Sequence, residues 1–233
     1  MSDEIVREIR CEILRRADPE NTEKIKAYFR EPVETYGISS PGEKEVVKKF
    51  YPAVKGDMNL TLQVAEALVK SGVLDEAGIG FKLVRRMVRN VEPIHFDVFD
   101  SWVDHVNNWA NTDGLSTWLI SETVKKDPSL IERLLVWTSS ENRWRRRASA
   151  VSLVPIARKG GMLAEVFAIA DRLMEDEDDM VRKGVGWLLK EASKEHPGEV
   201  RGCLLRWRAR TSALVLRYAS EKLPREKRVY KTK

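Results

Sequence analysis

The stretch Gly37-Ile38-Ser39-Ser40-Pro41 ends one helical segment and starts the next, a pattern that recurs along the chain. Gly37 suits the left-handed residue that closes a helix. Ser40, followed by Pro41 and by Glu43, fits an N-cap with proline in the first helical turn. The stretch therefore predicts two helices joined by a short turn.

Apolar residues recur at helical spacing on both sides of this break. Ile5, Ile9 and Ile13 are separated by charged residues and predict a helix over residues 3–17. No convincing alternating strand pattern occurs. The other expected helices cover residues 22–36, with a kink or an end at Pro32, and residues 42–51, 60–70, 76–89, 93–107, 109–125, 129–137, 142–158, 162–174, 180–194, 197–207 and 212–223.

Helices of this length, paired by short turns, are typical of stacked helical hairpins. A unit of about 35–45 residues, made of two helices and a break, recurs loosely along the chain. The expected fold is therefore all-α: a HEAT-like helical-repeat solenoid, an α-α superhelix whose concave face is the usual binding surface. No domain boundary is evident, so we expect a single domain over residues 1–233, with residues 224–233 as a flexible basic tail.

The composition excludes several classes of protein. With 42% hydrophobic and 33% charged residues, the chain is not disordered, and its apolar runs are far shorter than the ~20 residues of a membrane span. The N-terminal segment is amphipathic and carries acids, unlike a signal peptide. Cys11 and Cys203 are the only cysteines, which fits a reducing cytoplasm. They and the three histidines show no metal-ligand spacing, so no metal is expected.

The net charge of +5 is unevenly distributed. Residues 201–233 hold eleven Lys and Arg against Glu221 and Glu226, a local charge of +9, so the first 200 residues sum to about −4. A basic end on a folded chain favours a polyanion as partner. The alternative is a solvated tail with no partner.

Trp109 and Asp113 lie four residues apart in the stretch 107–118. On a helix they share one face, so an indole ring and a carboxylate would lie side by side. That pair suits a cationic, sugar-bearing ligand, because the ring attracts positive charge and the carboxylate stabilises it through space. The alternative is a core tryptophan beside a solvated or capping aspartate.

Four arginines, at positions 143, 145, 146 and 147, surround Trp144. Guanidinium groups bind phosphate oxygens well. Residues 148–157 are nearly all apolar or small, so one side of this helix should be buried and the arginines should start from a fixed element. The alternative is solvated surface with some ion pairing.

Gly184 and Gly186 interrupt a helical pattern directly before Trp187. Each glycine costs about 1 kcal/mol relative to alanine there, and glycine in a helix often marks the close approach of another helix or of a ligand. The alternative for Trp187 is a core residue packed among small neighbours.

Taken in order, these three pieces resemble one family, the DNA alkylation repair glycosylases of the AlkD type. The matching text is WANTD at residues 109–113, WRRRA at residues 144–148 and KGVGWLLKE at residues 183–191. The likeness extends upstream to Ala27-Tyr28-Phe29 and to the break at residues 37–41. It covers residues from about 20 to 200, and the ordered set is more specific than any one motif.

The resemblance implies a HEAT-like solenoid whose concave basic face holds duplex DNA containing alkylated bases. The activity implied is hydrolysis of the N-glycosidic bond of N3- and N7-alkylated purines, such as 3-methyladenine and 7-methylguanine, in base-excision repair and without a deep base-flipping pocket. No cofactor is implied. The chain would act as a monomer in the cytoplasm, on the nucleoid, and not at a membrane. By this resemblance the catalytic residues are Asp113, Trp109 and Trp187, and the DNA-binding residues are Arg147, Arg146, Arg143 and Tyr28.

Two departures from the family pattern affect these assignments. Asn108 precedes Trp109 where some relatives carry a second aromatic residue. The run of arginines leaves open whether Arg146 or Arg147 holds the phosphate, and Arg147 is favoured because it directly precedes Ala148. The alternative function is a non-enzymatic HEAT-like scaffold that binds nucleic acid or protein, which is what most such arrays do.

Overall fold

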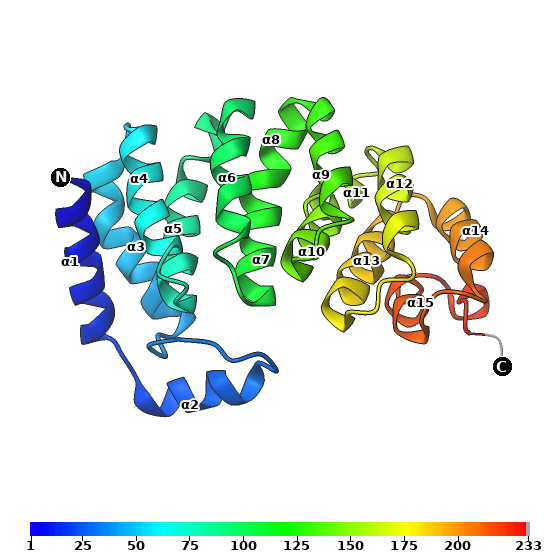
Figure 1. Ribbon diagram of the computed structural model, residues 1–233, viewed down its shortest axis with the longest axis horizontal. Coiled ribbons are helices and arrows are strands. Elements are labelled where there is room, and N and C mark those ends of the chain that lie inside the picture. The colour runs from blue at the N-terminus through cyan, green and yellow to red at the C-terminus, as the bar shows by residue number, and fades with distance from the viewer. Residues whose placement is uncertain (232–233) are drawn as a thin grey trace. The chain divides into compact units, whose positions relative to one another are not determined.

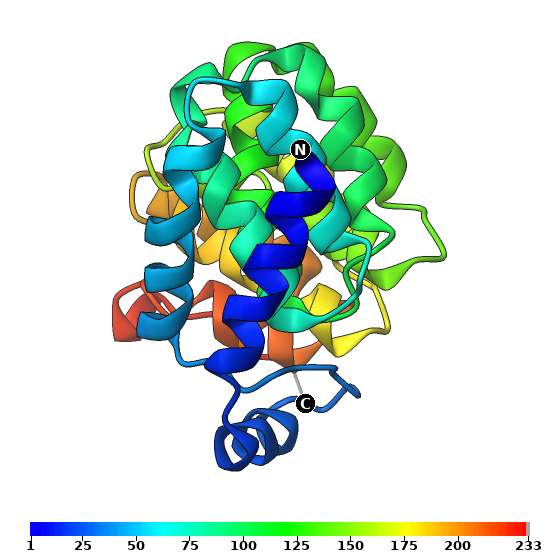
Figure 2. The same cartoon turned by 90° about the vertical axis from the view of Figure 1, so that its left-hand side faces the viewer.

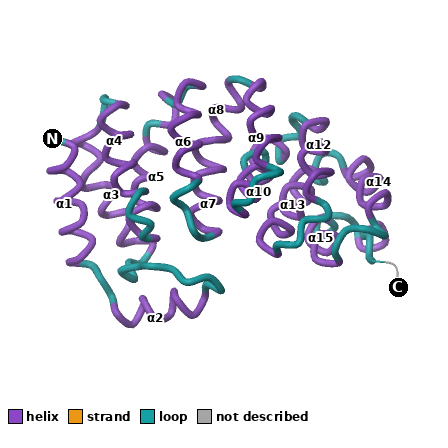
Figure 3. Tube along the Cα trace, viewed as in Figure 1, coloured by secondary structure: helices purple, strands orange, loops and turns teal. Residues whose placement is uncertain are grey.

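The computed structural model describes residues 1–231, and these residues contain helices, turns and loops but no strand (Figures 1 and 3). They form two compact units, residues 1–119 and the residues from Ile120 onward. Each unit has its own buried apolar residues. In the described residues, no helix combines the length and the apolar character that crossing a bilayer requires.

Unit 1 consists of α-helices with two short 3-10 segments between α5 and α6. Its core is built from the inward faces of α1, α3, α4 and α5, and residues such as Ile9, Val46 and Leu68 are completely buried there. The helices are α1 (Ser2–Arg15), α2 (Pro19–Tyr28), α3 (Ser40–Val54), α4 (Met58–Val69), α5 (Leu74–Arg86), α6 (Phe96–Val103) and α7 (Trp109–Leu115), and the 3-10 segments are Val88–Asn90 and Pro93–His95.

The predicted helix over residues 22–36 is wrong beyond Tyr28. The chain leaves α2 at Phe29 in an extended conformation and stays without helix until α3. Pro32, which lacks an N–H and disfavours helix at the residue before it, opposes continuation of α2. The far end of the extended segment is held by Asp75 on α5, whose carboxylate accepts hydrogen bonds from the Thr35 hydroxyl (2.7 Å) and from the Tyr36 backbone N–H (2.7 Å).

The break at residues 37–41 is real, but its parts have different roles from those predicted. Gly37 has φ +74° and does not cap a helix; a Cβ there would lie 2.3 Å from the Asp18 carbonyl oxygen, so only glycine fits. Ser39, not Ser40, is the N-cap of α3, and its side chain accepts from the Gly42 N–H.

Helix α2 differs from the rest of unit 1 because none of its residues is buried. It runs crosswise below the end of α1 (Figures 1 and 2), and the extended segment after it returns alongside it to α3 (Figure 3). The Asn21 amide donates to the Gly37 carbonyl at 2.7 Å and holds the two stretches together. Helix α2 is therefore attached mainly through its ends.

Unit 2 is organised around α13, which packs against α10, α11, α12 and α15. A π-helical segment, Ser116–Ile120, joins α7 to α8, so the helix predicted over residues 109–125 contains one widened turn. The helix predicted over residues 142–158 is interrupted after Val151, and Pro155, which lacks an N–H, lies in the first turn of the next helix. The helices are α8 (Ser121–Lys126), α9 (Ile131–Trp137), α10 (Arg143–Val151), α11 (Val154–Ala157), α12 (Leu163–Leu173), α13 (Asp179–Ala192), α14 (Pro197–Trp207) and α15 (Ala213–Ala219), with 3-10 segments Pro128–Leu130 and Arg225–Lys227.

The two glycines of α13 mark close approaches, as the sequence predicts. A Cβ on Gly186 would lie 2.5 Å from the Cβ of Tyr218 on α15, and one on Gly184 would lie 3.3 Å from Cγ of Arg147 on α10. The helices α10 and α15 therefore pack against α13 at distances that a side chain at either position would disturb.

Residues 224–231, which the sequence predicts to be part of a flexible basic tail, make contacts with the rest of unit 2. Val229 is 3% exposed and its N–H donates to the Ser220 hydroxyl. Arg208 donates to the Tyr230 carbonyl at 2.7 Å, and the Lys231 ammonium donates to the Thr211 carbonyl at 2.6 Å. Hydrogen bonds to backbone carbonyls thus fix part of the basic charge, and residues 232 and 233 lie outside the described part of the chain.

Candidate functional site

The first turn of α7 places Trp109. The buried Asn108 is the N-cap of this helix, and its side-chain oxygen accepts from the Asn111 N–H at 2.9 Å. Asn108 thus has a structural reason to be polar at a position where the family pattern allows an aromatic residue. The cap makes Trp109 the first residue of the helix, and the helical backbone then orients the indole side chain.

Trp109 forms an aromatic cluster with Tyr28 and Phe29, which end α2. The indole stacks on the Phe29 ring, with centroids 5.4 Å apart and planes inclined by 26°. The Tyr28 ring meets Trp109 edge-on at 6.1 Å and is 71% exposed. We call Tyr28, Phe29 and Trp109 the aromatic cluster; it joins α2 to α7 and presents one open edge to solvent.

Asp113 follows Trp109 by four residues on α7, so the two side chains share a face of this helix. Asp113 is partly buried, and its backbone carbonyl accepts a hydrogen bond from the Thr117 hydroxyl at 2.7 Å. The π-helical segment begins three residues later, at Ser116. Widened turns of this kind are frequent at functional sites.

The arginines of α10 are largely used inside unit 2. Arg143 forms an ion pair with Asp178 (3.1 Å), and Arg146 forms one with Asp176 (2.7 Å). Arg146 also donates to the backbone carbonyl of Ser140 at 2.8 Å. Both acids belong to residues 175–178, the acidic loop that directly precedes α13. The ion pairs therefore connect α10 to this acidic loop.

Arg147, the favoured phosphate ligand, is 5% exposed. Its Nη1 donates to the Met180 carbonyl in the first turn of α13, and its aliphatic part lies against Gly184. The bare face of Gly184 makes room for this side chain. The structure therefore gives Arg147 a partner within the protein, between α10 and α13.

Trp187 lies on α13, one turn after Gly184, and is partly buried. Gly184 and Gly186, which precede it, face α10 and α15 respectively. The structure thus brings Arg147 and the Trp187 helix together in unit 2, and Trp109, Asp113 and Tyr28 together in unit 1. The two groups belong to separate units.

Phe29 is the residue that sequence reasoning missed as a site member, although it appears in the Ala27-Tyr28-Phe29 likeness. Its ring stacks on Trp109, which no spacing rule reveals because the two lie 80 residues apart. The signal in the sequence that indicates a role for Phe29 is the pair of adjacent aromatic residues, Tyr28 and Phe29, at the end of a polar helix. Among the described residues, no group of three or more His, Cys, Asp or Glu is placed to hold a metal ion.

The family model described as DNA alkylation repair enzyme matches residues 9–223. The chain belongs to this family. This match confirms the predicted family resemblance, which is of the AlkD type. No curated protein matches the chain.

Solved structures show the same fold at low identity. A predicted DNA alkylation repair enzyme from Enterococcus faecalis superposes with a TM-score of 0.79 at 18% identity, over 90% of this chain and 98% of that one. AlkD2 from Streptococcus mutans gives a TM-score of 0.59 at 20% identity, over 87% of this chain and 97% of that one. The predicted all-α helical-repeat fold is confirmed, and the basic concave face stays a prediction.

Proposed function

We propose that this member of the family is a monofunctional DNA glycosylase that hydrolyses the N-glycosidic bond of N3- and N7-alkylated purines in duplex DNA. The substrates would include 3-methyladenine and 7-methylguanine nucleotides. Excision would begin base-excision repair, without a deep pocket for a flipped base and without a cofactor. The chain would act as a monomer on DNA in the cytoplasm.

The chemistry needs little from the protein, because an alkylated N3 or N7 already makes the base cationic. When the bond from C1′ to the base breaks, its electron pair neutralises the leaving base and positive charge develops on the deoxyribose, as in other oxocarbenium-like transition states. Water then adds its oxygen to C1′ and gives up a proton. Asp113 would stabilise the sugar cation and orient this water.

The observation that carries the proposal is the face of α7 that holds both Trp109 and Asp113, with Phe29 stacked behind the indole at 5.4 Å. The stacking fixes the plane of an aromatic surface one turn away from a carboxylate. A cation–π contact with the alkylated nucleotide would contribute roughly 0.5–2 kcal/mol. A protein that only bound phosphates would gain nothing from a carboxylate at this place, since like charges repel.

The remaining predicted residues complete the proposal. Trp187 would pack on the sugar-phosphate edge, and Tyr28, whose ring is largely exposed, would contact the nucleotide beside Trp109. Arg143, Arg146 and Arg147 are proposed to contact phosphates. Of the ion-paired arginines, Arg143 has the more exposed side chain, at 35% against 19% for Arg146.

The test is release of 3-methyladenine and 7-methylguanine from methylated duplex DNA by wild type and by Asp113→Asn. We expect wild type to release both bases and the variant to lose at least about 100-fold in single-turnover rate, with DNA affinity nearly unchanged. Glu132→Gln, at an exposed acid on α9, is the matched control and should keep the wild-type rate.

Two results would contradict the proposal. If wild type binds DNA in a salt-sensitive way but releases no base, the chain is a non-enzymatic scaffold of the same fold. If Asp113→Asn releases bases at the wild-type rate, the chain excises bases by a route that does not depend on this carboxylate.

A further inference from the structure

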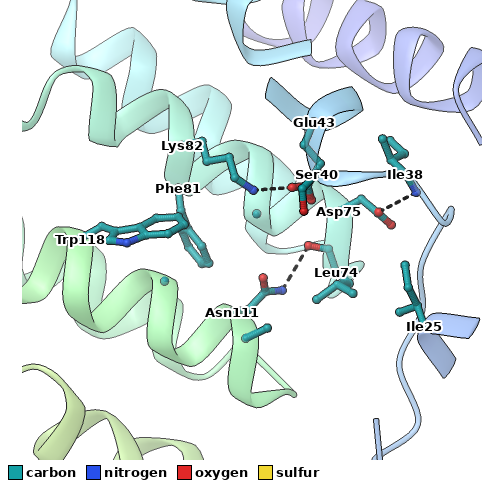
Figure 4. A pocket seen from close by; sticks show the side chains of 13 residues that line it. Ile25, Ile38, Ser40, Glu43, Leu74, Asp75, Phe81, Lys82, Asn111 and Trp118 are labelled. Carbon is teal, nitrogen blue, oxygen red and sulfur yellow. Dashed lines mark hydrogen bonds and ion pairs between the residues drawn. The ribbon is translucent and has the colours of Figure 1, made fainter. Parts of the chain in front are cut away.

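Unit 1 contains a pocket of about 250 Å³ that the proposed chemistry does not use. It lies among α2, α3, α5 and α7, and Figure 4 shows the side chains that line it. One end is polar, with Glu43, Lys82 and Asn111, and the walls are apolar, with Phe81 and Trp118. A mainly apolar pocket with a few convergent polar groups is the usual form of a small-molecule site.

The polar end of the pocket is built over a glycine. A Cβ on Gly78 of α5 would lie 3.4 Å from Oε1 of Glu43, 3.5 Å from Nζ of Lys82 and 3.9 Å from Oδ1 of Asn111. Three side chains from three helices thus converge on Gly78, a position of α5 that has no side chain. A methyl group at position 78 would lie in van der Waals contact with all three side chains and would take up the space beneath them.

The polar groups offer both donors and acceptors. Glu43 and Lys82 form an ion pair at 2.6 Å, and the Asn111 amide donates to the Leu74 carbonyl at 3.4 Å (Figure 4). Burial raises the pKa of the Glu43 carboxyl, although the Lys82 ammonium opposes this. The Lys82 ammonium and the Asn111 amide supply donors at this end of the pocket, and the Glu43 carboxylate supplies acceptors.

The walls of the pocket suit a flat ring. Phe81 and Trp118 form one side, and a Cβ on Gly114 would lie 3.4 Å from the Trp118 ring. The guanidinium of Arg85 lies 4.4 Å from the centroid of the same indole and holds its orientation. Planar aromatic surfaces of this kind favour another π system.

The pocket lies next to the proposed reaction face of α7. Ala110 and Gly114 line the pocket, and each directly follows a member of the Trp109 and Asp113 pair. Successive residues of a helix point about 100° apart, so the pocket wall and the reaction face are neighbouring strips of one helix. A molecule released at one strip has a short path to the other.

One wall of the pocket belongs to the least buried helix of the unit. Ile25 of α2 lines it, and α2 has no buried residue. Ile25 is only partly buried, so the pocket can exchange its contents with solvent on that side.

We propose that this pocket binds the free purine base after the glycosidic bond has broken. This inference rests on the proposed glycosylase function. At about 250 Å³ the space is smaller than the range typical of drug-sized ligands, roughly 300–1,000 Å³, which suits a single heterocycle rather than a nucleotide. The carboxylates of Glu43 and Asp75 disfavour a phosphate, whereas a purine edge presents the mixed donors and acceptors that the polar end can match.

The experiment measures binding of free 3-methyladenine to the full-length protein by calorimetry, with Gly78→Ala as the test variant. The added methyl fills the polar end while alanine favours the helix, so the fold should persist. We expect binding at least tenfold weaker than in wild type. Gly202→Ala is the matched control, since α14 is also helical there and no atom lies within 4 Å of the new Cβ; it should bind as wild type does.

Three outcomes overturn the inference: no binding of 3-methyladenine by wild type at millimolar concentration, equal binding by Gly78→Ala and wild type, or binding of indole as strong as that of 3-methyladenine. The last would mean that the pocket selects apolar rings without reading a purine edge. Because no DNA is present, these results are separate from the base-release assay. If wild type releases bases but does not bind the free base, the product site is ruled out and the glycosylase function stands. If wild type binds the free base but releases none from DNA, the glycosylase function is ruled out and the pocket is a purine site with no product role.

Discussion

The aromatic cluster of unit 1 and the arginines of α10 in unit 2 were both predicted to contact DNA, but their surroundings differ. In the aromatic cluster, Trp109 has an aromatic neighbour behind it, and the Tyr28 ring is largely exposed. On α10, Arg143 and Arg146 pair with the acidic loop, and the buried Arg147 donates to the first turn of α13.

This difference separates two kinds of residue that look equally functional in a sequence. Aromatic rings held on a partly open face do little for the core and so are free to meet a ligand. Arginines with protein acceptors stabilise the packing of α10 against α13, and a phosphate would have to compete with those acceptors. We therefore expect variants of the cluster to affect activity, and variants of Arg147 to affect stability in addition to DNA binding.

The largest expected effect is that of Arg147→Met. The variant keeps much of the side-chain volume but removes the donor to the Met180 carbonyl, so the free energy of unfolding should fall by about 1–3 kcal/mol. This corresponds to a decrease in Tm of roughly 2–10 °C for a chain of this size. Thermal unfolding measures it, with the exposed Lys159→Met as the control that should leave Tm unchanged.

A different result for Arg147→Met would place Arg147 with the residues that contact DNA and not with those that stabilise the fold. If Arg147→Met keeps the wild-type Tm but weakens DNA binding and lowers the slope of log K against log[salt] by about one, the contact of Arg147 with a phosphate outweighs its contact with α13.

Next comes Trp109→Ala, which should reduce kcat/KM for base release about 5- to 30-fold, the equivalent of roughly 1–2 kcal/mol of lost cation–π and stacking contact. The decrease in stability should be smaller than that of Arg147→Met. Trp109→Phe retains a ring against Phe29 and should recover most of the activity. An alanine variant with full activity per folded molecule would remove the aromatic cluster from the site.

A third prediction uses the two cysteines, one in each unit. Burial raises the pKa of the Cys203 thiol to about 11, whereas Cys11 is exposed. Since the thiolate is the reactive form, iodoacetamide should label Cys11 about 100-fold faster than Cys203 at pH 8, as read by mass spectrometry. In Arg147→Met the labelling of Cys203 should accelerate and that of Cys11 should not. Equal acceleration at both sites would mean that the substitution loosens the whole chain.

The smallest effect concerns acid stability in unit 1. Hydrogen bonds from Lys49 (2.7 Å) and Arg16 (2.8 Å) lower the pKa of Glu12 from 4.5 to about 2 and join α1 to α3. The folded state thus favours the charged carboxylate, so its contribution is complete above pH 4.5 and is lost as the pH falls toward 2. The Tm difference between wild type and Glu12→Gln should shrink over this interval. A difference that stays constant from pH 7 to pH 2.5 would show that the ion pairs add no stability.

Local patterns in the sequence predicted most of the helices. The stripe of Ile5, Ile9 and Ile13 is buried in α1, and the helix expected at residues 180–194 is α13, Asp179–Ala192. Such predictions succeed because helix period, caps and breakers act over a few residues. The placement of Trp109 and Asp113 on one helical face succeeded for the same reason.

Several features that the sequence did not reveal depend on contacts between residues far apart in the chain. The extended backbone at Tyr36 bonds to Asp75, and the packed C-terminal segment is held by the Arg208 donor and the Thr211 carbonyl acceptor, each about 20 residues upstream of its partner. The stacking of Phe29 on Trp109 is of the same kind. Periodicity says nothing about such partners, because it does not identify which buried donor meets which acceptor.

The sequence alone determined the helical-repeat fold, the family and the carboxylate beside an indole on α7, because period and motif order are local properties of the chain. Only the tertiary structure decided that Arg147 has a protein acceptor on α13 and that Glu43 and Lys82 converge over the bare face of Gly78. A guanidinium binds a carbonyl or a carboxylate as readily as a phosphate, so the residue type leaves its partner open until the packing supplies one.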